Sequence, residues 1–167
     1  KMRVHYDRWW ADIEPRVNEH VDITIGSEAE PVTMLSAADW QDVFLDQQKQ
    51  VRAGLTRSGP WGLEVARDGT YVFELRRWPR EADLALTADA PAFHAVAGAL
   101  PAGKALPIAQ ARLRVGDVEK TQVVPPDSAS VSFTIPLKAG HLKAQGWFQD
   151  AAGTPLCGAY FIYVHRD

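Results

Sequence analysis

The sequence has little of several features that mark common functional classes. It contains one cysteine, Cys157, so no disulfide can form within the chain and the cellular compartment is left open. No apolar run approaches the length of a transmembrane helix, and no segment has the pattern of a signal peptide. The formal net charge of -3 provides no basic field for nucleic acid and no polybasic patch for a membrane surface. We therefore expect neither nucleic acid nor membrane as a partner.

Motifs for catalysis and for metal binding are also missing. No histidine has a second histidine or a carboxylate at a metal-binding spacing such as His-x-x-x-His, and no Gly-x-Ser-x-Gly nucleophile elbow is found. Cys157 stands in a turn before an apolar strand, where a cysteine is most often a small buried residue. The sequence therefore predicts no catalytic residue and no metal site in this chain. The scattered histidines are His5, His20, His94, His141 and His165.

What the sequence does have is a series of short segments with alternating apolar and polar residues. Gly, Pro and Asp turns separate these segments, and no strand–helix–strand rhythm is present. The alternation is strictest in 131–137, whereas 159–164 is apolar on both faces, as expected of a strand in the middle of a sheet. This pattern predicts a mainly β fold, an antiparallel β-sandwich with a short helical or irregular N-terminal segment. Further strands are predicted at 21–25, 106–115, 118–124 and 142–148.

The clearest folding signal lies in residues 61–75. One alternation before Asp68-Gly69 and another after it predict a β-hairpin. A three-residue loop, 67–69, keeps the apolar residues on one face by pairing Val65 with Tyr71, and it puts Gly69 where a left-handed conformation is expected. Pro79 ends the second strand, because it has no N–H for the ladder. The apolar face comprises Trp61, Leu63, Val65, Tyr71, Phe73 and Leu75.

The other segments carry weaker signals. Residues 1–20 form an amphipathic connecting segment, in which Trp9 and Trp10 either pack at a domain junction or cover the end of this domain's own core. Ser36 precedes a short predicted helix at 37–46. Residues 47–59 are predicted to be a polar loop, and residues 81–104 a long loop with one strand around 83–87.

One group of residues is a candidate site: Arg76, Arg77, Trp78, Arg80 and Glu81, at the end of the second strand of the hairpin. The indole and the guanidinium groups could hold a sugar ring and a sulfate ester, because arginine offers paired donors to oxyanions. Alternatively, Trp78 covers an open end of the sandwich while Arg77 pairs with Glu81, or the group faces a partner domain. Strand parity places Trp78 away from the apolar face of the hairpin unless a bulge intervenes.

Trp147 is the second candidate residue. It lies on the outward parity of its strand together with Lys143 and Gln145, so the indole is expected to be exposed. Trp78 and Trp147 would be the stacking platforms of an independent carbohydrate-binding module for sulfated glycans. Arg112 and Arg114, also on an outward parity, are interpreted as a solvated face.

Several segments, in this order, also carry a resemblance to a known family. LRRWPRE at 75–81, followed far downstream by CGAYF at 157–161, is the most specific combination. The remaining segments are RWW at 8–10, ITIGS at 23–27, 35–40 ending in DW, VFLDQQKQ at 43–50, WGLEV at 61–65 and GTY at 69–71. Together they span nearly the whole chain, and with them the chain resembles the C-terminal domain of bacterial arylsulfatase-type sulfatases of the alkaline-phosphatase superfamily.

The resemblance implies a parent protein with two domains, one catalytic and one non-catalytic. Sulfatases of that family carry a Cys-or-Ser-x-Pro-x-Arg motif, whose Cys or Ser becomes formylglycine, with Asp and Asn ligands for calcium, and this chain has no such motif. The implied parent is a sulfuric ester hydrolase, for which a periplasmic or extracellular location is compatible. Because Lys1 precedes Met2, we expect a fragment: residues 1–20 link a missing catalytic domain to residues 21–167, a non-catalytic C-terminal domain that supports it and lines its cleft.

Overall fold

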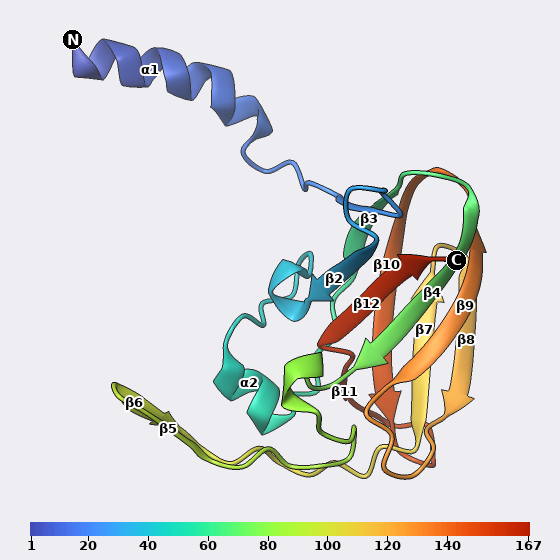
Figure 1. The fold of residues 1–167 in the computed structure, drawn as a ribbon. Helices are drawn as coiled ribbons and strands as arrows, with labels where there is room; N and C mark the ends of the chain where they lie inside the picture. Colours follow the sequence, from blue (N-terminus) through green and yellow to red (C-terminus); the bar gives the residue numbers. More distant parts are fainter.

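The computed structural model describes residues 1–167 and is built around two β-sheets packed face to face, with a separate two-stranded sheet outside this sandwich (Figure 1). The predicted mainly β sandwich with a short N-terminal helix is confirmed. None of the helices combines the length and the hydropathy needed to span a bilayer. Sheet A has the strand order β1 (Ile23–Ile25), β3 (Trp61–Val65), β10 (Gly140–Gln149), β7 (Gln110–Val115) and β8 (Val118–Val123), and β11 (Pro155–Gly158) also pairs with β10. Sheet B has the order β2 (Val32–Ser36), β12 (Phe161–Arg166), β4 (Gly69–Arg76) and β9 (Val131–Leu137).

The alternation in the sequence identifies the core correctly. Every second side chain of β9 points inward, and Trp61, Phe73 and Phe133 are completely buried between the sheets. The strands predicted at 106–115 and 118–124 correspond to β7 and β8, which pair as a hairpin with Val115 opposite Val118. The central position predicted for the last strand is also confirmed, because β12 lies between β2 and β4.

The predicted hairpin at 61–75 is wrong, although its two strands exist. β3 pairs with β1 and β10 in sheet A, whereas β4 pairs with β12 and β9 in sheet B. The chain therefore crosses from one sheet to the other, and the two apolar faces meet across the core instead of side by side. Alternation alone cannot distinguish these arrangements, because both bury the same side chains. Gly69 begins β4 and does not have a positive φ.

Three local predictions also fail. The helix predicted at 37–46 is only the 3₁₀ turn η2 (Ala37–Asp39), and Asp42 has a left-handed φ of 62° that a helix could not accommodate. The supposed loop 47–59 contains helix α2 (Gln48–Ala53), which begins with a capping box between Gln47 and Gln50 and ends at Gly54. The strand predicted around 83–87 is absent, and a small hairpin forms later, from β5 (Phe93–Ala95) and β6 (Gly98–Leu100). β2 had no counterpart in the prediction.

The N-terminal arm, α1 (Met2–Ile13) followed by the 3₁₀ turn η1 (Glu14–Arg16), extends away from the sandwich (Figure 1). None of its residues is buried, and Trp9 is 49% exposed. The rings of Tyr6 and Trp10 stack at 6.3 Å between centroids with 6° between their planes. Trp9 and Trp10 therefore do not cover the end of this domain's core, which excludes one of the two sequence interpretations.

The crossing between β3 and β4 generates a testable prediction at Gly26. The Tyr71 hydroxyl donates to the Arg67 carbonyl oxygen at 2.7 Å, and a Cβ on Gly26 would lie 2.2 Å from that hydroxyl oxygen. Gly26 also has a φ of +75°. We expect Gly26→Ala to lower the free energy of unfolding by about 1–2 kcal/mol from φ alone, and by more because Tyr71 must move. Urea unfolding followed by fluorescence measures the change.

Gly153→Ala is the matched control, because Gly153 has a φ of +83° and nothing within 4 Å of the added Cβ. This variant should lose only the stability that a positive φ costs an alanine, because its added Cβ meets no neighbouring atom. Equal losses of stability in the two variants would contradict the role given to the contact between Gly26 and Tyr71.

Candidate functional site

The candidate residues at 76–81 form a corner at the end of sheet B. β4 ends at Arg76, Pro79 leads into the 3₁₀ turn η3 (Arg80–Ala82), and Asp83 closes the turn in a left-handed conformation. Because the strand has ended, its parity no longer governs where Trp78 points. Trp78 turns inward and is only 4% exposed.

Arg77 is completely buried and serves as a structural cation. Its guanidinium Nη1 donates to the Ala88 carbonyl oxygen at 3.1 Å and to that of Leu86 at 3.5 Å, and its Nη2 donates to the Lys104 carbonyl oxygen. Burial lowers the pKa of Arg77 from its ordinary value. The predicted ion pair with Glu81 is wrong: no carboxylate contacts Arg77, and Glu81 is exposed. The charge is held by backbone carbonyl dipoles instead.

Trp78 closes the end of the core above Arg77. The Arg77 Cζ lies 4.5 Å from the centroid of the indole, and the indole Nε1 donates to the Ala88 carbonyl oxygen at 3.3 Å. A Cβ on Gly103 would lie 2.9 Å from Trp78 Cη2. The indole is therefore enclosed by the 86–104 segment and presents no open stacking face for a sugar ring.

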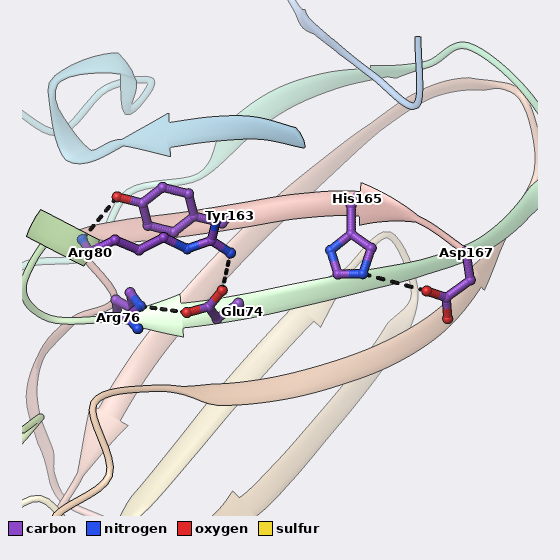
Figure 2. A network of polar contacts seen from close by, with 6 residues as sticks. All are labelled: Glu74, Arg76, Arg80, Tyr163, His165 and Asp167. Atoms are coloured by element: carbon purple, nitrogen blue, oxygen red, sulfur yellow. Dashed lines mark hydrogen bonds and ion pairs between the residues drawn. The ribbon is translucent and has the colours of Figure 1, made fainter. Parts of the chain in front are cut away.

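Arg76 and Arg80 converge on Glu74 at the outer face of sheet B (Figure 2). The guanidinium carbon of Arg80 also lies 4.1 Å from the centroid of the Tyr163 ring. The backbone N–H of Arg80 donates to the Tyr163 hydroxyl oxygen at 3.1 Å. Burial raises the pKa of Glu74, but the hydrogen bonds from Arg80 and Arg76 outweigh it, so the pKa lies below its ordinary value. Both guanidinium groups are thus committed to a carboxylate of the same chain.

An apolar groove borders the corner and was not predicted. A hollow of about 290 Å³ lies between α2 and the corner, and a second, of about 110 Å³, continues along α2 toward β2. The two hollows share Gln48, Val51 and Phe161, so we treat them as one feature, the α2 groove. Its walls at the corner include Trp78, Pro79, Ala82 and Leu84. The groove depends on α2, which the sequence does not predict.

The second candidate, Trp147, lies half-buried on the outer face of sheet A. It is directly opposite Arg112 of the neighbouring strand, and the guanidinium carbons of Arg112 and Arg114 lie 5.0 and 5.7 Å from the centroid of its ring. An indole beside guanidinium groups is therefore buried at Trp78 but partly exposed at Trp147. The two arginines had been interpreted only as a solvated face.

Cys157 and Tyr160 lie in the core near Arg77 and have no access to solvent. Burial raises the pKa of the Cys157 thiol to about 12, so the thiol is protonated and unreactive at neutral pH. The Tyr160 hydroxyl donates to the Leu55 carbonyl oxygen at 2.7 Å. The prediction of a small buried cysteine agrees with this placement.

Arg77→Met should destabilise the protein strongly, because it leaves the carbonyl oxygens of Leu86, Ala88 and Lys104 without this donor. We expect a loss of about 3 kcal/mol in the free energy of unfolding, and faster proteolytic cleavage within 83–104. Arg67→Met, at a half-exposed arginine, is the control and should change neither quantity appreciably. An Arg77→Met variant as stable as this control would contradict the structural role.

Glu74→Gln should weaken the protein at neutral pH by about 1 kcal/mol, a value that allows for solvent screening. Because the folded-state pKa of Glu74 is lowered, its contribution is present above the unfolded-state value of about 4.3 and is lost as the pH falls below it. The stability difference between wild type and variant should therefore shrink between about pH 5 and pH 3. A difference that is constant over this range in urea unfolding would contradict the network.

Comparisons with known proteins give little further information. No protein-family model matches the chain, and no curated protein matches it either. Among solved structures, it is similar to a ruminal GH26 endo-β-1,4-mannanase, with 12% sequence identity and a TM-score of 0.44. That match covers 81% of this chain and 26% of the mannanase chain. A likeness at this level carries no argument about activity.

Proposed function

We propose that this chain is a non-catalytic accessory domain that packs against a partner domain through one side of the sandwich. The distribution of exposed apolar side chains carries the proposal. Apart from Val118 and Val123 on β8, the large exposed apolar residues lie on the N-terminal arm and the segment leading to β1, on β2, on the loop before α2, and on the β5–β6 hairpin. They are Met2, Val4, Tyr6, Trp9, Val17, Val21, Val32, Met34, Phe44, Phe93 and Val96.

The arrangement of these elements supports a shared contact surface. In Figure 1, α1 and the β5–β6 hairpin both project toward the side of the sandwich on which α2 lies, whereas β8 is at the opposite side. The α2 groove adds a concave apolar feature to this surface. Exposed apolar patches of this kind are typical of interaction sites, and buried aromatic anchors supply most of the affinity in such interfaces.

The resemblance of the sequence identifies the partner in this proposal as the catalytic domain of an arylsulfatase-type enzyme in the same chain. Residues 1–20 would then be the linker and residues 21–167 the C-terminal domain. The LRRWPRE residues fit a supporting role, because Arg77 and Trp78 build the corner from inside while Pro79 lines the groove. Calcium and formylglycine would belong to the catalytic domain, and in this chain no three His, Cys, Asp or Glu residues are grouped as a metal site.

The first test is the reading frame upstream of Lys1. We expect a Cys-or-Ser-x-Pro-x-Arg motif within several hundred codons. The upstream domain and this chain, produced separately, should then form a complex on mixing. Replacing Trp9 and Trp10 by serine should weaken that complex at least tenfold in calorimetry, because central aromatic residues contribute about 2 kcal/mol or more to an interface.

The matched control replaces Val118 and Val123, which are exposed on the opposite edge of the sandwich, by serine. This pair should leave the affinity unchanged. An unrelated domain or a start codon directly upstream would overturn the sulfatase assignment. Equal affinities for the two double variants would overturn the surface assignment.

A further inference from the structure

The outer face of sheet A around Trp147 forms a second surface, distinct from the side assigned to the partner domain. Trp147 and Gln145 come from β10, and Arg112 and Arg114 come from β7. Their strand neighbours Leu113, Gly146 and Phe148 are buried, so the four side chains point away from the core. We call these four residues the Trp147 face.

The polar groups of this face are ordered by contacts within the chain. Arg114 Nη2 donates to Gln145 Oε1 at 2.9 Å, and Gln145 Nε2 donates in turn to the Ser58 carbonyl oxygen at 2.9 Å. Arg112 Nη2 pairs with Glu119 Oε2 at 2.8 Å. Glu119 is the only carboxylate paired with this face, so two guanidinium groups against one carboxylate leave an excess of one positive charge beside the indole.

The partners of the two arginines differ in a way that matters for a ligand. Arg112 forms an ion pair with Glu119. Arg114 lies opposite the same Glu119 in the strand register, but its guanidinium group is exposed and donates a hydrogen bond only to the neutral carboxamide of Gln145. Lys143, two residues before Gln145, is exposed and forms no side-chain hydrogen bond or ion pair. Its cross-strand neighbour is Gly62, and the Asp22 carboxylate lies over that glycine. Arg112, Arg114 and Lys143 therefore stand against the carboxylates of Glu119 and Asp22, which leaves an excess of one positive charge here in a chain whose net charge is -3.

The chemistry of the face selects a class of ligand. A guanidinium group binds oxyanions through paired N–H donors, and a half-exposed indole offers an apolar surface to the C–H face of a sugar ring. A ring that carries an anionic ester uses both features at once, whereas a neutral sugar uses only the indole and a free inorganic anion only the guanidinium groups. We infer that the Trp147 face binds a sulfated saccharide, with the ring against the exposed part of Trp147 and the sulfate at Arg114, whose guanidinium group has no ion pair with a carboxylate.

The test is calorimetric titration of the 167-residue chain with a sulfated tetrasaccharide prepared from κ-carrageenan. We expect binding that is at least tenfold tighter than to the chemically desulfated tetrasaccharide or to inorganic sulfate, and that weakens as salt is raised from 50 to 200 mM. Arg114→Gln should weaken binding of the sulfated sugar about tenfold and leave any binding of the desulfated sugar unchanged. Trp147→Ala should weaken binding of both.

Arg67→Gln is the matched control. It changes a half-exposed arginine in the loop between β3 and β4, whose partner is Glu28, and it should bind the sulfated sugar like wild type. If Trp147→Ala fails to fold, Arg112→Gln and Arg114→Gln still test the face, because both change polar side chains outside the core. Equal affinity for sulfated and desulfated sugar, or equal affinity for a short DNA duplex, would overturn the inference. These results are independent of the proposed partner domain, whose test uses Trp9 and Trp10.

Discussion

The fully buried guanidinium group of Arg77 is the constraint on which the corner and its surroundings depend. Three carbonyl oxygens, of Leu86, Ala88 and Lys104, converge on one cation, although the first and the last of them are separated by a long segment with little regular structure. A cation without a carboxylate is costly to bury, so its hydrogen bonds must persist together. Because this segment is fixed, Trp78 is enclosed and the wall of the α2 groove is defined.

The sequence predicted which side chains form the core much better than it predicted which strands are neighbours. The alternation in β3, β4 and β9 follows directly from burial of one face, and the structure confirms it. Partner choice depends on how the chain crosses between the sheets, and an alternating pattern contains no information about that crossing. Trp147 illustrates the same limit: its outward direction was predicted, but its neighbours Arg112 and Arg114 follow only from the pairing of β10 with β7.

The corner was misread for a different reason. A run of arginines beside a tryptophan resembles a ligand site, because charged residues are usually exposed. Whether an arginine is buried depends on hydrogen-bond acceptors that are far away in the sequence. The acceptors of Arg77 are main-chain oxygens, which every residue has, so the sequence does not indicate where they are. α2 was missed for a related reason: it is short, and Gln47 and Gln50 start it by capping each other, with little apolar periodicity.

The position of β12 has a consequence for how the protein is made. This strand is the last in chain order, yet it lies between β2 and β4 and supplies Ile162 and Val164 to the core. During synthesis, sheet B cannot be completed until residues 161–166 have left the ribosome, and until then β2 and β4 have unpaired edges. Sheet B therefore depends on contacts between strands that are far apart in the sequence, and contacts of this kind slow folding and leave strand edges open to aggregation until they form.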